Sequence, residues 1–169
     1  LSVAYIYAFT SLDNSYRKMI ENELIRHASF IFSNLEKMHG NSNNHYLSNL
    51  IGLLWISFLS EDNSLSIQWK NYAIRNLENE IRNQIYEDGF NYEGSTWYHN
   101  FSTEIFALSK ILLLNNGIRV SNTFDDKLKK MFEVVENFSF NNQQANIGDN
   151  DSGCIFRHNF STSLRIDDL

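Results

Sequence analysis

Apolar residues recur at three- and four-residue steps over most of this chain, which is the period of a helix with one buried face. The first such stretch begins at Asp13, and its apolar positions are Tyr16, Ile20, Leu24, Ala28, Ile31, Leu35 and Met38. The same period predicts helices over 44–60, 64–86 and 98–115, and a last one that begins at Thr123. Because short connections join them, consecutive helices should pack as antiparallel hairpins, and the sequence predicts an all-α body.

Two of the predicted helices carry finer signals. The 64–86 helix has an i,i+4 spine that should face the core, made of Trp69, Ala73, Leu77, Ile81 and Ile85. On its outer side Glu78 and Arg82 are placed for a favourable ion pair. The last helix opens at Thr123 with Asp126 three positions later, which is similar to a capping box. Its expected buried residues are Phe124, Leu128, Met131, Val135 and Phe138.

Helical periodicity stops in two places. Residues 88–97 contain an Asp-Gly and a Glu-Gly turn signal, and no helical pattern follows Asn141. The segment 154–164 has few helix-forming residues and follows a turn cluster, so it predicts a strand at the start of a different module. The chain also begins and stops without a closing element, and we expect it to be a piece of a larger protein.

Composition and charge exclude several function classes. A net charge of −6 leaves no general basic field, so we expect no nucleic-acid partner. Cys154 is the single cysteine and cannot form an internal disulfide or a cysteine-type zinc site. The five histidines include no HExxH pair, and the sequence has no glycine-rich phosphate loop or GxSxG motif, so neither a metal nor another cofactor is predicted. Its apolar runs are shorter than the ~20 residues of a membrane span, and no span is predicted.

The 44–60 helix is apolar almost all round, which is typical of a helix buried inside the body. Its small or polar positions form one narrow stripe headed by Asn44, made of His45, Ser48, Asn49 and Gly52. Two interpretations stay open at this point. The stripe either faces solvent or a hydrogen-bonding neighbour, or it lines an internal cleft in which Gly52 leaves room for a ligand.

Aromatic and polar side chains are concentrated in residues 88–100, a loop that leads into a helix. They are Tyr92, Glu93, Trp97, Tyr98, His99 and Asn100. Carbohydrate sites combine aromatic rings with hydrogen-bonding groups, since sugars present flat C–H faces and a rim of hydroxyls. Aromatic loop residues also plug the ends of helical bundles, and this alternative stays open.

Residues 147–153 resemble the start of a calcium-binding loop. However, Cys154 and Phe160 stand where an EF-hand needs its glycine and its closing glutamate, so that site is excluded. We interpret the segment as a tight turn, rich in Asp and Asn, between two modules.

Residues 43–47, 88–99 and 147–153 are called the first, second and third motif below. Together, and in this order, they resemble the heparinase II/III-like polysaccharide lyases, which include certain alginate lyases. The resemblance implies an N-terminal (α/α) toroid of antiparallel helical hairpins, a C-terminal β-sandwich, and a substrate cleft between them. Residues 1–145 are then part of the toroid lyase domain, and residues 146–169 are the linker and the first strands of a truncated sandwich.

The resemblance also implies catalytic roles. In this family an Asn or His early in the buried helix contacts the uronate carboxyl group, and Asn44 and His45 match it. A later Tyr sits over the scissile bond, and Tyr98 matches that position. Hydrogen bonds from Asn44 and His45 would stabilise the charge that builds on the carboxylate when the C5 proton leaves. Tyr98 would protonate the leaving O4 and, with a lowered pKa, would also take the C5 proton of one substrate epimer.

Other members of the site follow from the family and from side-chain type. The family also uses a β-sandwich histidine, which His158 does not match, so the catalytic set of this piece is expected to be incomplete. Tyr92 and Trp97 are expected to stack on sugar rings and His99 to hydrogen-bond the substrate. Arg157 or Arg165 is expected to bind the acidic groups of the substrate through charge-assisted contacts.

Three function hypotheses follow. The first is a lyase that cleaves uronic-acid-containing glycans by β-elimination, with an acidic polysaccharide as its partner. The second is a non-catalytic glycan-binding or scaffold protein on the same toroid, and the third is a helical-hairpin interaction domain whose polar stripe is hydrogen-bonded core. With 14 Lys and Arg residues, a plain polyuronate is favoured over a densely sulfated polymer. The resemblance favours a periplasmic or secreted protein, while a cytoplasmic one stays open.

Overall fold

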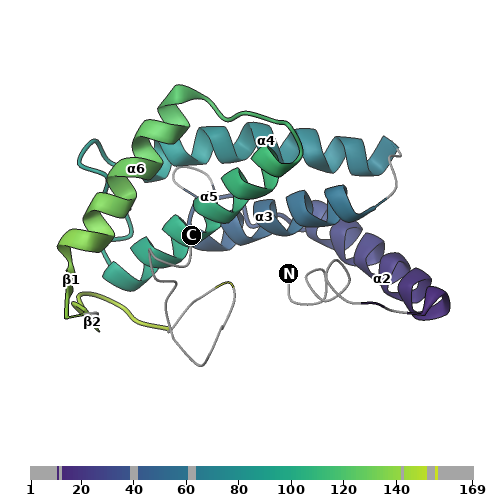
Figure 1. Ribbon diagram of the computed structural model, residues 1–169, viewed down its shortest axis with the longest axis horizontal. Coiled ribbons are helices and arrows are strands. Elements are labelled where there is room, and N and C mark those ends of the chain that lie inside the picture. Colours follow the sequence, from purple (N-terminus) through teal and green to yellow (C-terminus); the bar gives the residue numbers. More distant parts are fainter. Residues whose placement is uncertain are drawn as a thin grey trace.

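The helical body has the predicted architecture. The computed structural model describes residues 11, 13–38, 42–60, 64–141, 143–151 and 155. Its elements are α2 (Asn14–Ser33), α3 (Asn44–Leu59), α4 (Ser64–Gln84), α5 (Thr96–Asn115), α6 (Asn122–Asn137), β1 (Ser139–Phe140) and β2 (Gln143–Gln144). The described elements are almost entirely helical, which confirms the all-α prediction, and consecutive helices alternate in direction (Figure 1). α2 with α3, α3 with α4 and α5 with α6 pack as neighbouring pairs, whereas α5 packs against α3 rather than against α4, which precedes it. The division near residue 145, the toroid and the β-sandwich stay predictions.

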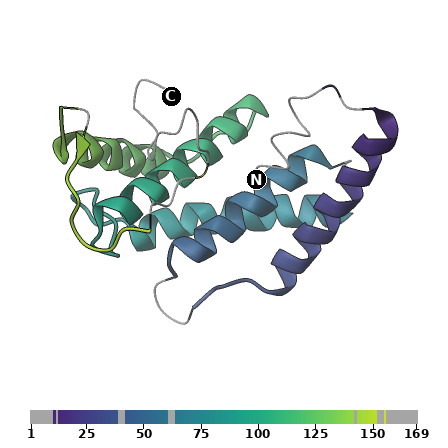
Figure 2. The ribbon, with the colours of Figure 1, turned by 90° about the horizontal axis from the view of Figure 1, so that it is seen from below.

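Helix α3 lies at the centre of this arrangement. It packs against α2, α4 and α5, while α6 packs against α4 and α5 (Figure 2). Six of its side chains are 0% exposed, namely Tyr46, Leu47, Leu50, Ile51, Leu53 and Leu54. Burial of side chains of this size contributes roughly 1.5–3 kcal/mol each. A helix that is apolar almost all round is stable at this position because its neighbours cover it on several sides.

Helix α4 presents its predicted spine to the core. The residues that confirm this by their burial are Trp69, Ala73, Leu77 and Ile81. Ile85 is also buried but lies just past the end of the helix, which stops two residues before the predicted end. The predicted ion pair on the outer side is also present, with Arg82 Nη2 3.0 Å from Glu78 Oε2. Glu78 additionally accepts the backbone N–H and the hydroxyl of Ser121, at 2.7 and 2.6 Å, and so ties α4 to the start of α6.

The first predicted helix ends earlier than its apolar pattern indicates. α2 stops at Ser33, and Met38, predicted to be buried, is 59% exposed. The backbone N–H of Glu36 donates to Asn49 Oδ1 on α3 at 2.8 Å. Because this N–H binds a side chain of another helix, it does not continue the ladder of α2. Leu35 and Met38 therefore lie on an irregular segment between α2 and α3.

Capping residues explain where α5 and α6 begin. α5 starts at Thr96, ahead of the predicted position, because the Ser95 hydroxyl accepts two backbone N–H groups of its first turn. The N-cap of α6 is Ser121, which accepts the N–H of Phe124, so the capping-box prediction at Thr123 is wrong.

The buried face of α6 follows the prediction in its first turns only. Phe124, Leu128 and Met131 are buried, but Val134 is buried in place of Val135. Steps of three and four residues both keep side chains near one helix face, so the sequence pattern fits either valine. Phe138, the last predicted core position, is half-buried and packs its edge against Phe90 at 5.6 Å between ring centroids.

The end of the described chain is not helical. β1 and β2 pair antiparallel, and the connection contains Asn141 with φ 50°, a left-handed conformation that Asn tolerates. The strand predicted over 154–164 lies outside the described residues except for Ile155. Among the residues that the structure describes, no helix has both the length and the apolar character needed to cross a membrane.

Candidate functional site

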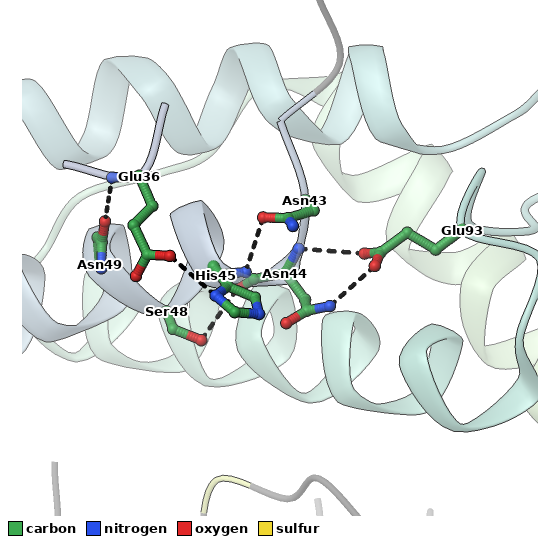
Figure 3. Close-up of polar contacts among 7 residues, drawn as sticks. All are labelled: Glu36, Asn43, Asn44, His45, Ser48, Asn49 and Glu93. Atoms are coloured by element: carbon green, nitrogen blue, oxygen red, sulfur yellow. Dashed lines mark hydrogen bonds and ion pairs between the residues drawn. The ribbon is translucent and has the colours of Figure 1, made fainter. Parts of the chain in front are cut away.

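The first turn of α3 places Asn44 against a carboxylate from the second motif. Asn43 caps the helix, and Asn44 follows it with only 9% of its surface exposed. The backbone N–H of Asn44 donates to Glu93 Oε1 at 3.1 Å, and its Nδ2 donates to Glu93 Oε2 at 2.8 Å (Figure 3). Because a carboxylate only accepts hydrogen bonds, this contact turns the amide nitrogen of Asn44 toward Glu93 and uses one of its two N–H groups.

The loop that carries Glu93 is fixed on both sides. The Tyr92 hydroxyl donates to the carbonyl oxygen of Ser42 at 3.1 Å, just before α3. Asn91 is 0% exposed, and its Nδ2 donates to Ser102 Oγ on α5 at 3.2 Å. The Glu93 backbone N–H donates to Asn91 Oδ1 at 2.9 Å. These bonds bring the first two motifs, far apart in sequence, into direct contact.

The rest of the polar stripe on α3 meets the segment that follows α2. His45 is exposed, and its Nδ1 lies 2.9 Å from Glu36 Oε2 (Figure 3). Asn49 binds the backbone of the same Glu36. A β-carbon added at Gly52 would lie 3.6 Å from the Cδ1 atom of Ile31, an ordinary van der Waals contact, so α2 packs close to this turn. Of the two interpretations of the stripe, these contacts favour a hydrogen-bonding neighbour over a ligand cleft at Gly52.

The third motif lies across the first turn of α5. The backbone N–H of Thr96 donates to the carbonyl oxygen of Ile147 at 3.0 Å. The Ser95 hydroxyl, which caps the helix, donates to the carbonyl oxygen of Asp149 at 2.5 Å. All three motifs thus meet where α3 and α5 begin.

Tyr98, in the first turn of α5, is held as a neutral phenol. Its hydroxyl donates to Asp151 Oδ2 of the third motif. This hydrogen bond raises the pKa of Tyr98 to about 12, and partial burial and the negative charges of Asp151, Asp149 and Glu93 act in the same direction. Proton abstraction by this phenol requires a lowered pKa, whereas these carboxylates raise the pKa and keep the phenol protonated, which is the form that a general acid needs. Glu93, which binds Asn44, also acts electrostatically on Tyr98.

Asp151→Asn is expected to bring the pKa of Tyr98 from about 12 toward its ordinary value of 10.0, because the substitution removes the carboxylate that accepts the phenol proton. A spectrophotometric titration of tyrosinate absorbance measures this change. The Tyr98→Phe protein identifies which step of the titration belongs to Tyr98. An unchanged titration in Asp151→Asn would contradict the assignment.

His99 has a structural role in this geometry. It is 1% exposed, its Nδ1 accepts the backbone N–H of Asn91 at 3.2 Å, and its Nε2 donates to the carbonyl oxygen of Met131 at 3.0 Å. These partners require the neutral ring with the proton on Nε2, and burial lowers the pKa of His99. The ring also stacks on Phe90 at 4.9 Å between centroids. Because both nitrogens are engaged inside the chain, the predicted hydrogen bond from His99 to substrate does not fit this arrangement.

Of the remaining residues predicted to contact substrate, two are half-buried and the others lie outside the described residues. Tyr92 and Trp97 are half-buried, and Trp97 Nε1 donates to Asn146 Oδ1 at 2.8 Å. Arg157 and Arg165, predicted to bind acidic groups, lie outside the described residues, as does His158. Among the described residues, no group of three or more His, Cys, Asp or Glu side chains could hold a metal ion.

Two acidic residues of this site have no role assigned from the sequence. Glu93 and Asp151 both belong to the motifs, but their partners, Asn44 and Tyr98, are remote along the chain. Their place in the motifs was the available signal. The Glu93 pairing depends on the packing of α3 beside α5, and the Asp151 pairing on the position of the third motif at the first turn of α5.

Comparison with known proteins gives one result. The family model described as Heparinase II/III N-terminus matches residues 5–164 and so includes all three motifs. No curated protein and no solved structure matches the chain.

Proposed function

The chain belongs to the heparinase II/III family, and from this premise we propose that it carries the Asn44 and Tyr98 side of the active site of a polysaccharide lyase. The proposed reaction is β-elimination in a uronic-acid-containing polymer. The observation that carries this proposal is the meeting of the three motifs at the first turns of α3 and α5, with a buried amide on one helix and a phenol on the other.

Asn44 and His45 are proposed to bind the uronate carboxyl group. Ionisation of that group makes the C5 proton hard to remove, and hydrogen bonds to its oxygens stabilise the negative charge that develops on it. Glu93 holds one N–H of the Asn44 amide and leaves the second for substrate. Glu93 is therefore proposed as a positioning residue that fixes the plane of this amide.

Tyr98 is proposed as the general acid. A base removes the proton from C5, the electron pair forms the C4–C5 double bond, the C4–O4 bond breaks, and the phenol of Tyr98 gives its proton to O4. A phenol with a pKa of about 12 is protonated at neutral pH, which suits donation to a departing alkoxide. The family resemblance assigns the base to a histidine of the β-sandwich. Half-buried Trp97 next to Tyr98 is proposed to stack on a sugar ring.

The proposed function is tested by incubating the full-length protein with a panel of polyuronates and following the near-ultraviolet absorbance of unsaturated uronate. Appearance of this absorbance with one polymer supports the lyase and identifies its substrate class. A folded protein that binds a polyuronate without producing the absorbance would support the non-catalytic glycan-binding alternative instead.

His45→Ala is expected to raise KM for the polyuronate about tenfold while changing Tm little, since a hydrogen bond to a charged group contributes about 1.5–3 kcal/mol. The ring is exposed, and its contact with Glu36 is a surface contact of small value. Glu36→Gln is the matched control, because it removes the carboxylate beside His45 and keeps the ring. A lower Tm with unchanged KM would show that His45 only packs against its neighbours.

A further inference from the structure

A polar hollow lies beside this site, between the segments that flank residue 40 and the C-terminal half of α4. Its volume is about 360 Å³, within the range of small-ligand sites. The lining residues that the structure describes are all polar or charged: Lys37, Ser42, Asn76, Asn79, Glu80, Arg82 and Asn83. This described part of the lining disfavours an apolar ligand, because none of its side chains is hydrophobic or aromatic.

Three of the lining residues are deeply buried although they are polar. Ser42 is 2% exposed, Asn76 5% and Glu80 4%. Asn76 Nδ2 donates to the carbonyl oxygen of Tyr72 at 2.8 Å, and Glu80 Oε2 accepts from Gln84 Nε2 at 2.9 Å. These bonds fix both side chains in place. Burying polar groups has a free-energy cost that is offset when they face a cavity with polar contents, so the hollow suits a ligand rich in hydroxyl groups.

The other lining residues add positive charge and carboxamides. Lys37 Nζ lies 5.7 Å from the ring centroid of Tyr46, and Arg82 is oriented by bonds to Glu78 at 3.0 Å and to Ser121 at 3.2 Å. Asn79 and Asn83 are exposed and offer both donors and acceptors. Burial raises the pKa of Glu80, which disfavours a negative charge at the floor of the hollow. Two cations beside amide groups match a sugar that carries a carboxylate and several hydroxyls.

The hollow lies next to residues of the proposed active site. Ser42 lines it and also accepts the hydrogen bond from Tyr92 of the second motif. Lys37 follows Glu36, the residue that contacts His45. We propose that this hollow is a subsite for an acidic sugar residue of the polymer, away from the bond that is cleaved. This inference rests on the proposed function, since it places a further unit of the same substrate.

Lys37→Met tests the subsite, because it removes the charge and keeps a side chain of similar length against Tyr46. Binding of an alginate tetrasaccharide to the chain is measured by calorimetry, with neutral cellotetraose and inorganic phosphate as reference ligands. The matched control is Lys70→Met, which removes another lysine that lies over an aromatic ring, 5.2 Å from the Phe58 centroid. Lys37→Met is expected to weaken tetrasaccharide binding about tenfold, and Lys70→Met to leave it unchanged.

Equal affinities in the two variants, or no binding by the unaltered chain, would overturn the subsite. Phosphate that binds as tightly as the tetrasaccharide, with the same dependence on Lys37, would also overturn it and indicate a general anion site. The lyase is tested separately by turnover in the full-length protein. Binding that depends on Lys37, without turnover, supports the subsite and rejects the lyase. Turnover with the same KM in Lys37→Met as in the unaltered protein supports the lyase and rejects the subsite.

Discussion

Tyr98→Phe is expected to lower the rate of β-elimination by the full-length protein about a hundredfold or more, the usual contribution of a positioned general acid. The substitution keeps the ring in the first turn of α5 and removes only the hydroxyl that donates to Asp151. Without it, O4 must leave as an alkoxide or take its proton from water. The initial rate of formation of unsaturated uronate measures the effect, at substrate concentrations below and above KM.

The matched control is Tyr86→Phe, which removes the hydroxyl of a tyrosine that is 56% exposed, outside the three-motif contact. It should leave the rate unchanged. Full lyase activity in Tyr98→Phe would show that the phenol is not the proton donor. No turnover by the unaltered protein, together with modestly weakened glycan binding in Tyr98→Phe, would favour a sugar-holding role for Tyr98 over catalysis.

The helical body could be predicted because its signals are local. The steps of three and four residues in 64–86 mark the face that packs inward, and burial of Trp69 and Ile81 confirms it. The wrong predictions concern helix ends that are set by a residue far away in the sequence. The backbone N–H of Glu36 donates to Asn49 on α3 instead of continuing α2. No property of residues 34–38 alone indicates this bond. Ser121 likewise caps α6 while bound to Glu78 of α4.

The same distinction applies to the site. Asn44, His45 and Tyr98 could be predicted as site residues because the three motifs are short, ordered and recognisable as a resemblance, and their roles stay predictions. The sequence gives no measure of their electrostatic surroundings, so the direction of the pKa change at Tyr98 could not be predicted. That direction depends above all on Asp151, which reaches Tyr98 only after the third motif folds over α5. For His99 the aromatic context suggested a sugar contact, but tight packing between Phe90 and Met131 makes it part of the core.

Glu104 on α5 is expected to contribute stability that is lost as pH rises from about 5 to 8. This carboxyl is 5% exposed, and Oε2 accepts the backbone N–H of Ile155 at 2.6 Å. Within the described part of the chain, Oε1 is buried without a hydrogen-bond partner. Burial raises the pKa of Glu104 from 4.5 to about 7. The folded state therefore keeps a proton that the unfolded state loses in this pH window, and unfolding becomes easier as pH rises.

Glu104→Gln is expected to remove this pH dependence, because an amide of nearly the same shape has no charge to bury. At pH 8 the variant should have a free energy of unfolding higher by on the order of 3 kcal/mol, with little difference near pH 5. Urea unfolding at both pH values measures this. Exposed Glu133 on α6 provides the control substitution Glu133→Gln, which should keep the pH dependence of the unaltered chain. If Glu104→Gln and Glu133→Gln lose stability equally between pH 5 and 8, the carboxyl of Glu104 is not the group that titrates.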